Sequence, residues 1–272
     1  MIQPKISVVT VCYNAVNDIE KTILSVINQT YPNVEYLIID GGSTDGTMDV
    51  VNKYKDKIDV IVSEPDKGIY DAMNKGAKLS RGIYVQFLNA GDILFDNNVF
   101  STLFNEIECD EVDVLYGDIV YVMNYGRFYK KPEPIDNFRK TFPIAHPATF
   151  VNKKILKTLR FDTKYRIAAD FAFLKQIYDN EGVFLYKEDV PVAIFDSVSG
   201  VSSKNVYKAW YEYNLVLGNQ KKIFWKYKCL MKKIRITLSN VVCTIYDKLN
   251  HNSYQKFLVK RQLRNQTFKL IS

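Results

Sequence analysis

Two stretches of the sequence decide the fold: Tyr36-Leu37-Ile38-Ile39-Asp40-Gly41-Gly42-Ser43-Thr44-Asp45 and Gln86-Phe87-Leu88-Asn89-Ala90-Gly91-Asp92. Each begins as an apolar run that is typical of a buried strand, and each ends in a short turn that carries a carboxylate. Ligands of open α/β sheets bind at the carboxyl ends of the strands. The two stretches therefore predict an α/β protein with a site at these two turns.

The segments around them alternate between strand and helix patterns. Apolar runs predict strands at 6–11, 34–39, 58–62 and 82–88, and helical spacing predicts helices at 19–27, 48–54 and 69–77. This order favours right-handed crossovers and a mostly parallel, twisted sheet flanked by helices. The second half predicts helices at 99–107 and 169–178, a hairpin of strands at 112–122 and 127–131, and strands at 148–151, 183–186 and 190–195.

The charge is unevenly divided along the chain. The net charge is +7, but residues 1–203 contain 22 Lys and Arg against 28 Asp and Glu, a net −6, whereas residues 204–272 contain 15 against 2, a net +13. Helical patterns rich in Lys and aromatic residues begin at Val206. We therefore expect an α/β domain over 1–203 and a basic, aromatic-rich helical extension over 204–272.

The cysteines and the hydropathy pattern indicate a compartment. The four cysteines lie far apart, without the spacing of a metal site or a disulfide framework, which favours a reducing compartment. Residues 1–5 carry no apolar stretch of signal-peptide type, and no window reaches the roughly 18 apolar residues of a membrane span. We expect a cytoplasmic protein that does not span a membrane.

The turn after residue 39 offers a ligand and a helix cap. Asp40 ends a buried strand before two glycines that allow close approach, and such a carboxylate can accept hydrogen bonds from a base or a ribose. In an ordinary turn, Ser43 or Asp45 would instead cap the next helix. We expect both, with Asp45 as the cap and Asp40 as the nucleoside ligand.

Three other side chains are candidates for chemistry. Asp92, near the amide of Asn89, is a hard oxygen ligand suited to Mg²⁺ or Mn²⁺ on a diphosphate, or else a helix cap. Asp170 opens an amphipathic helix and could deprotonate an acceptor hydroxyl, although Asp at this place is commonly a cap. His146 is an acceptor-side candidate, although a lone His is more often structural. The sequence shows no P-loop, Rossmann glycine motif, catalytic triad or zinc spacing.

These motifs together resemble those of family 2 glycosyltransferases, which have the GT-A (Rossmann-like) fold. The resemblance spans residues 5–200 and rests on an ordered set of segments: Ile6-Ser7-Val8-Val9-Thr10-Val11-Cys12-Tyr13-Asn14, Ile39-Asp40-Gly41-Gly42-Ser43-Thr44-Asp45-Gly46-Thr47, Glu64-Pro65-Asp66-Lys67-Gly68-Ile69-Tyr70-Asp71-Ala72-Met73-Asn74-Lys75-Gly76, Leu88-Asn89-Ala90-Gly91-Asp92, Tyr116-Gly117-Asp118 and Ala169-Asp170-Phe171. The ordered set is far more specific than any of its members.

The resemblance implies an inverting transfer of a hexose or N-acetylhexosamine from a nucleotide diphosphate donor, such as a UDP-sugar, to a polysaccharide or lipid-linked acceptor. It places Asp92 on Mn²⁺ or Mg²⁺ and makes Asp170 the general base. It assigns nucleotide-sugar binding to Val11, Tyr13, Asn14, Asp40, Asp66, Lys67, Gly68, Asp71, Asn74 and Asn89. Inversion needs one base and a neutralised leaving group, and no enzyme nucleophile.

The chain departs from the family pattern at three places. Gly41 follows Asp40 where two successive acids are common, so that recognition of the base rests on one carboxylate. The usual Asp-x-Asp is Asn89-Ala90-Gly91-Asp92, and Ala169 replaces the acid that commonly precedes the base. Two alternatives stay open. A nucleotidyltransferase on a similar scaffold would need a glycine-rich basic loop after the first strand, which Cys12-Tyr13-Asn14-Ala15 does not supply, and the altered Asp-x-Asp suggests a catalytically silent sugar-nucleotide-binding or scaffold protein.

The basic extension has three readings. Residues 221–235 interleave cations with large apolar side chains, which suits an interfacial helix on an anionic membrane. A helix packed on the core with solvated Lys, and a nucleic-acid-binding segment, are the alternatives. We favour the inner face of the cell membrane, because a lipid-linked acceptor would make that location useful, and we expect no nucleic-acid partner because no nucleic-acid-binding fold is visible.

Overall fold

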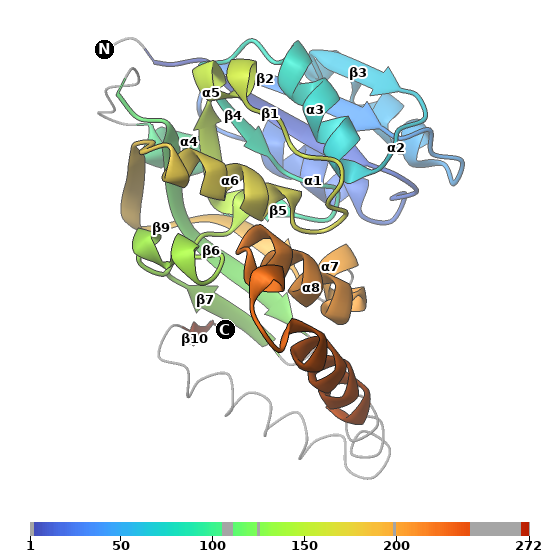
Figure 1. Ribbon diagram of the computed structural model, residues 1–272. Coiled ribbons are helices and arrows are strands. Elements are labelled where there is room, and N and C mark those ends of the chain that lie inside the picture. Colours follow the sequence, from blue (N-terminus) through green and yellow to red (C-terminus); the bar gives the residue numbers. More distant parts are fainter. Residues whose placement is uncertain (1–2, 105–110, 124–125, 198–199, 240–267, 272) are drawn as a thin grey trace.

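A computed structural model describes residues 3–104, 111–123, 126–197, 200–239 and 268–271 (Figure 1). Its strands form one curled sheet in the order β10-β7-β6-β8-β4-β1-β2-β3, and β9 pairs with β5 and β6. The strands are β1 (Ile6–Cys12), β2 (Val34–Asp40), β3 (Val60–Ser63), β4 (Tyr84–Phe87), β5 (Ile93–Leu94), β6 (Val114–Met123), β7 (Gly126–Lys130), β8 (Thr149–Asn152), β9 (Phe184–Asp196) and β10 (Phe268–Ile271).

The first four strands confirm the predicted parallel sheet. β3, β2, β1 and β4 are parallel neighbours, with Cys12 opposite Asp40 at the carboxyl ends of β1 and β2. Every residue of β1 is buried, because helices cover both faces of the sheet. β3 begins at Val60, two residues later than predicted, since the 3-10 helix η1 (Lys55–Lys57) leads into it.

Helices pack on the two faces of the sheet in separate groups. α1 (Ile19–Ile27), α2 (Thr47–Lys53) and α4 (Val99–Leu103) share one apolar cluster, and α3 (Ile69–Leu79), α5 (Lys153–Thr158) and α6 (Ala169–Asp179) share the other. The part of the predicted 99–107 helix beyond residue 104 lies outside the described residues. The remaining short elements are η2 (Ile135–Arg139), η3 (His146–Ala148), α7 (Val201–Lys204) and η4 (Asn219–Lys221).

The second half is joined to the parallel strands by antiparallel pairing. β8 is antiparallel to both β4 and β6, and the predicted hairpin appears as β6 and β7, with Met123 opposite Gly126. Its turn at 124–125 lies outside the described residues. The two strands predicted at 183–186 and 190–195 are one strand, β9, because pairing with β6 continues across a bulge near Gly117.

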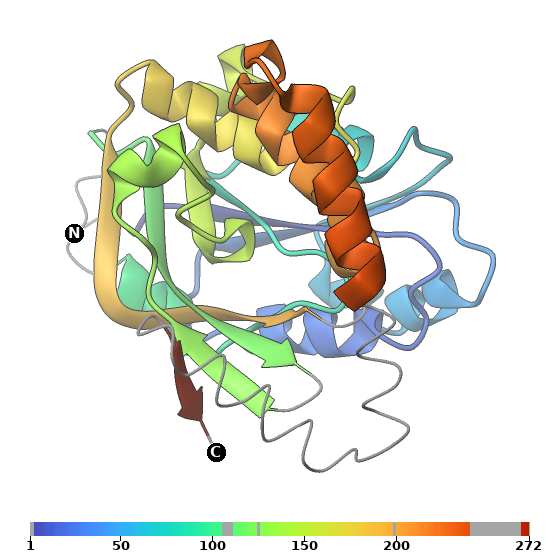
Figure 2. The same cartoon turned by 60° about the horizontal axis from the view of Figure 1, so that its bottom comes forward.

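The described residues of the extension from 204 to 239 are mostly helical, and the first of these helices packs against the α/β domain. α8 (Val206–Val216) lies beside α6, as Figure 2 shows, and the Tyr213 ring lies 5.5 Å from that of Phe171. A further helix covers residues 225–239 and extends away from the sheet in Figure 1. Among the described residues, no helix is both long and apolar enough to cross a membrane.

Candidate functional site

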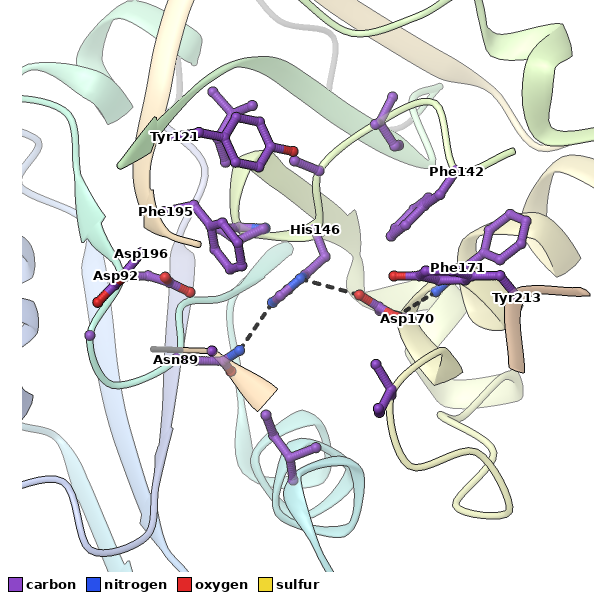
Figure 3. Close-up of a pocket in the computed structure, with 18 of the residues that line it drawn as sticks. Asn89, Asp92, Tyr121, Phe142, His146, Asp170, Phe171, Phe195, Asp196 and Tyr213 are labelled. Carbon is purple, nitrogen blue, oxygen red and sulfur yellow. Dashed lines mark hydrogen bonds and ion pairs between the residues drawn. The ribbon is translucent and has the colours of Figure 1, made fainter. Parts of the chain in front are cut away.

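A cavity of about 930 Å³ lies between the carboxyl ends of β1 and β4 and the helices α6 and α8. Of the side chains singled out in the sequence, it brings together Tyr13, Asn14, Asn89, Asp92, His146 and Asp170. Figure 3 shows His146 between Asn89 and Asp170, with Asp92 farther along the same cavity. Of the two turns that decided the fold prediction, residues 89–92 line the cavity, whereas the turn after β2 lies behind Asn14, which it holds.

The loops after β1 and β2 are tied together beside this cavity. The Asn14 N–H donates to Ser43 Oγ at 2.7 Å, and the Thr44 N–H donates to Asn14 Oδ1 at 2.9 Å. Asn14 has a left-handed backbone, φ +48°, which Asn tolerates better than most residues. The Tyr13 side chain is 64% exposed at the cavity edge, as a ring that receives a planar base would be.

Asp40 is bound by protein groups on all sides. Its fully buried carboxylate accepts N–H groups of Gly42 and Ser43, the hydroxyls of Ser43 and Ser63, and the thiol of Cys12. Burial opposes ionisation, but the hydroxyl donors outweigh it and hold the pKa of Asp40 below its usual value. In this structure Asp40 orders the turn, and its direct contact with a nucleoside stays a prediction.

The capping role predicted for Asp45 is displaced by one residue. The N-cap of α2 is Gly46, which has φ +94° and no side chain that could accept a helix N–H. Asp45 stands just before it and accepts the Thr47 N–H at 3.0 Å and the Val16 N–H at 3.1 Å. Asp45 therefore ties α2 to the loop after β1, because the left-handed turn needs glycine at the cap itself.

The absence of a second acid after Asp40 has a steric reason. A Cβ on Gly41 would lie 2.5 Å from Asp66 Oδ2 and 3.3 Å from the Tyr13 ring. Asp66 therefore occupies the space that a side chain at position 41 would need, and its Oδ1 accepts the Gly68 N–H at 2.7 Å. A carboxylate does lie beside Tyr13, but it comes from the loop after β3.

The other predicted donor residues surround that loop without lining the cavity. Asp71 accepts the Lys67 N–H at 3.1 Å, and Gly68 has φ +117°. Both ends of the Asn74 amide bond the backbone of Phe161, and Val11 is buried in β1. Their part in donor binding stays a prediction, and the structure shows how they shape the loop.

Asp92 is a buried carboxylate in the loop after β4. It is 4% exposed, and burial raises its pKa to about 7 despite the nearby His146 and a backbone hydrogen bond from Asp196. Asn89 Oδ1 is buried with no hydrogen-bond partner among the described residues. Those residues contain no cluster of three His, Cys, Asp or Glu side chains that could enclose a metal. One or two oxygen ligands suffice for Mg²⁺ or Mn²⁺ when diphosphate and water complete the shell, so the residues fit a metal carried with a nucleotide.

Asp170 lies at the centre of a polar network. Its Oδ2 is 3.3 Å from His146 Nδ1, and its Oδ1 is 3.1 Å from the Tyr70 hydroxyl and accepts the Phe171 N–H at 2.8 Å. His146 Nε2 lies 3.2 Å from Asn89 Nδ2. The N-cap of α6 is Ala168, so Asp170 belongs to the first helical turn and faces the cavity. It is placed to take a proton from a group bound there.

The opposite end of the cavity is aromatic. Phe142, Phe171 and Tyr213 contact one another with ring centroids 5.1 to 6.3 Å apart, beside Asp170 in Figure 3. Trp210 of α8 also lines the cavity. Flat apolar rings of this kind can pack against the apolar face of a sugar.

The sequence motifs missed several residues of this site. Arg166, Asp196 and residues of α8 line the cavity, and Tyr70 both lines it and contacts Asp170. The charge pattern of the sequence could have drawn attention to α8, because Glu212 is one of only two acids in residues 204–272. In the structure Glu212 is 6% exposed. An isolated buried acid in a strongly basic segment indicates a specific partner.

The sequence matches a known family over most of its length. The model of the family described as glycosyl transferase family 2 matches residues 7–181. A PGL/p-HBAD biosynthesis glycosyltransferase of Mycobacterium tuberculosis is 28% identical over 213 residues, 76% of this chain and 83% of that protein. The Escherichia coli UDP-Glc:alpha-D-GlcNAc-diphosphoundecaprenol beta-1,3-glucosyltransferase WfaP is 32% identical over 132 residues, 47% of this chain and 52% of WfaP.

Solved structures share the fold. TarS 1–349 of S. aureus in complex with UDP-GlcNAc has a TM-score of 0.60 at 21% identity; the match covers 78% of this chain and 66% of that one, so this chain spans about two thirds of it. A Pyrobaculum calidifontis mannosyltransferase in complex with GDP-Man and Mn²⁺ has a TM-score of 0.60 at 15% identity and is matched over 98% of this chain and 88% of that one. With the family match over residues 7–181 and the site at the strand ends, the chain belongs to glycosyl transferase family 2 and has the GT-A fold.

Proposed function

We propose that the protein transfers a hexosyl or N-acetylhexosaminyl group, with inversion, from a UDP-sugar to a hydroxyl of a polysaccharide or lipid-linked acceptor. The observation that carries this proposal is Asp170, whose carboxylate faces a cavity that begins at Tyr13 and continues past Asp92. The neighbour that holds UDP-GlcNAc supports the choice of donor, and WfaP, named for a diphosphoundecaprenol acceptor, supports the choice of acceptor.

Asp170 acts as the general base in this proposal. It removes the proton of the acceptor hydroxyl while that oxygen attacks the anomeric carbon, and the nucleotide diphosphate leaves from the opposite face of the sugar. His146, with Nδ1 protonated, donates to Asp170 Oδ2 and so fixes the carboxylate. Tyr70 keeps its proton, because burial and the charge of Asp170 raise its pKa. No enzyme nucleophile takes part.

The donor side combines the loops after β1, β3 and β4. Tyr13 would contact the base, the loop from Asp66 to Asn74 would bind the ribose and diphosphate, and Asp92 and Asn89 would hold Mn²⁺ or Mg²⁺. A divalent cation there would neutralise the charge of the departing diphosphate. Asp196 makes a backbone hydrogen bond to the Asp92 carboxylate and adds a second acidic side chain to the cavity lining.

The helix at residues 225–239 suits an anionic membrane surface. Tyr227, Leu230, Met231, Ile234 and Leu238 recur at helical spacing and are 43 to 61% exposed, with Ile223 and Phe224 exposed just before them. Exposed cations at Lys226, Lys228, Lys233 and Arg235 flank this stripe. The opposite face of the same helix packs on the domain, where the Trp225 ring centroid lies 5.6 Å from that of Trp210, which lines the cavity, so the stripe itself is left free to meet a surface.

Release of UDP tests the function. The full chain is incubated with Mn²⁺ and, one at a time, UDP-glucose, UDP-galactose and UDP-N-acetylglucosamine, with water or a lipid-diphosphate sugar as the acceptor. We expect one donor to be consumed faster than the others and faster still with the acceptor. UDP binding without any turnover under all conditions would favour the sugar-nucleotide-binding scaffold instead.

A further inference from the structure

The carboxylate of Glu212 in α8 binds three consecutive backbone N–H groups of another segment. Oε2 accepts from Arg166 at 3.0 Å, Ile167 at 2.7 Å and Ala168 at 3.1 Å, and Oε1 accepts from Arg166 at 3.1 Å. The side chain is buried, although α8 belongs to the strongly basic part of the sequence. A buried carboxylate with this many donors fixes the conformation of the segment that it binds.

These N–H groups lead directly into α6. The N-cap of α6 is Ala168, which has no side-chain oxygen, so the segment before the helix needs an acceptor from elsewhere. Glu212 supplies that acceptor from α8 and places a negative charge at the positive end of the α6 dipole. Asp170 follows two residues later, within the same first turn.

The segment held by Glu212 connects the donor and acceptor sides of the site. The Arg166 Nη1 donates to the Lys67 carbonyl oxygen at 2.6 Å, and a Cβ on Gly68 would lie 3.0 Å from the same Nη1. The Tyr70 hydroxyl lies 2.6 Å from the Ile167 carbonyl oxygen and 3.1 Å from Asp170 Oδ1. A displacement of residues 166–168 would therefore move both the loop at Lys67 and the carboxylate of Asp170.

We propose that Glu212 is a positioning residue for the transfer reaction. By holding residues 166–168 it sets Asp170 against His146 and Tyr70, and it sets Arg166 against the loop after β3. The first helix of the basic extension, α8, then belongs with the catalytic domain, and the proposed membrane contact is left to the chain after α8. This inference rests on the proposed role of Asp170 as the base.

The test compares two buried glutamates of the full-length chain. Glu212→Ala and the milder Glu212→Gln, which keeps one acceptor oxygen, are matched with Glu35→Ala. Glu35 is 1% exposed and accepts the Arg81 N–H at 2.7 Å, but it lies at the amino end of β2, away from the cavity. Each variant loses at least one buried acceptor oxygen, and only the Glu212 variants lose or weaken the contact with residues 166–168.

The first readout is hydrolysis of the UDP-sugar that the wild-type chain consumes fastest, normalised to folded protein. We expect Glu212→Ala to lower kcat about 10- to 100-fold and to raise the KM for the donor, because the loop at Lys67 moves with residues 166–168. Glu212→Gln should fall between it and wild type, and Glu35→Ala should keep a normal kcat and KM. In the Asp170→Asn background, Glu212→Ala should cause no further loss, because it acts through Asp170. Equal losses in both backgrounds, or a kcat within twofold of wild type for both Glu212 variants, would overturn the proposal.

The second readout needs no turnover. Hydrogen exchange should lose protection at the amides of 166–171 and 64–68 in Glu212→Gln, and should not change there in Glu35→Ala. Unchanged protection overturns the positioning role even if catalysis is impaired. If the wild-type chain hydrolyses no UDP-sugar, the proposed donor is wrong, whereas the exchange data still decide whether Glu212 holds the segment. Should Glu212→Ala not fold, Glu212→Gln carries both readouts.

Discussion

The carboxylate of Asp170 combines two roles that seemed to be alternatives. It bonds the Phe171 N–H in the first turn of α6, as a capping residue would, and it also contacts His146 and Tyr70 at the cavity. The Phe171 N–H bonds Oδ1, whereas Oδ2 contacts His146 at 3.3 Å and keeps a second lone pair, so local helix geometry and catalysis do not exclude each other. Substitution separates the two roles, because Asn can keep the N–H contact but cannot accept a proton.

Asp170→Asn should therefore reduce turnover while donor binding persists. We expect kcat to fall about 100-fold or more, the usual scale for a general base, and the Kd for UDP with Mn²⁺ to stay near the wild-type value. Asp179→Asn, at the exposed end of the same helix, is the matched control. Normal turnover in Asp170→Asn would return this residue to a structural role.

The second prediction at this scale concerns pH and the metal. Burial raises the pKa of Asp92 to about 7, above its unfolded value, so the free energy that this group contributes to folding is present at low pH and is lost as the pH rises toward 7. A metal binds the ionised form, so the Mn²⁺-dependent affinity for UDP should be about 10-fold weaker at pH 6 than at pH 8. Titration calorimetry at both pH values measures this. Asp92→Asn should lose the Mn²⁺ dependence, and the exposed control Asp96→Asn should keep it. A Mn²⁺ effect that survives in Asp92→Asn contradicts the assignment.

The sequence could predict residues at strand ends but not the contacts between them. Asp92 and Asn89 follow an apolar strand and Asp170 lies in a segment that resembles a family motif, so the sequence could place all three near the site. The contact of His146 with Asp170 depends on η3 and α6 meeting across the cavity, which no local pattern encodes. Likewise, Asp40 carried the signal of a ligand, but the structure surrounds it with protein donors, because a buried strand-end carboxylate is satisfied by the nearest hydroxyls and N–H groups.

At the scale of elements, the parallel strands were predictable and the later pairings were not. Each of β1 to β4 is a local apolar run, whereas β5, with two residues, and β10, with four, exist through partners far along the chain. β9 looked like two strands because polar residues Lys187, Glu188 and Asp189 interrupt its apolar pattern. Residues 187–190 bulge out of the pairing with β6, and the same pairing resumes at Pro191, so that both halves belong to one strand.

The packing of α3 on the sheet gives a stability prediction. Gly76 faces β1 and β2, and a Cβ there would lie 2.3 Å from Val9 Cγ1 and 3.3 Å from Ile39 Cγ1. Helix propensity alone would make Gly76→Ala stabilising by about 1 kcal/mol, but overpacking of a rigid core costs about 1 to 3 kcal/mol. We expect a net loss of stability, seen as a lower urea midpoint with an unchanged slope.

Lys78→Ala provides the control in the same helix, because Lys78 is exposed and its replacement removes no core contact. Its urea midpoint should stay close to that of wild type. A Gly76→Ala variant that is as stable as this control would mean that β1 and α3 can separate without cost, against the close contact that the structure shows.

The charge of the whole molecule divides between the net negative residues 1–203 and the net positive residues 204–272, and α8 of the second part packs against the first. The boundary at residue 203 stays a prediction, yet α8 beyond it lines the cavity and binds residues 166–168 through Glu212. Within the described residues of the extension, the exposed cations and large apolar side chains lie mainly after residue 220. The functional division therefore falls more naturally after α8 than before it.

The last prediction follows from that surface. Lys226, Lys228 and Lys233 are exposed beside the apolar stripe, and each cation near an anionic leaflet contributes about 1 kcal/mol of attraction that salt screens. Changing all three to Glu should abolish sedimentation with phosphatidylglycerol vesicles at about 0.1 M salt, while UDP binding stays normal. Truncation at residue 220 is a poorer test, since it also removes β10 from its pairing with β7.

The matched control changes Lys53, Lys55 and Lys57 to Glu, three exposed lysines in and after α2. Both triple variants alter the net charge of the chain equally, so a difference between them reports the location of the charges and not their sum. Vesicle binding should persist in the control, fall with rising salt, and be absent from neutral phosphatidylcholine vesicles. Equal loss in both variants would mean that the membrane attracts the whole chain nonspecifically. If the wild-type protein never sediments with anionic vesicles, the stripe at 223–238 is instead a surface for protein contacts.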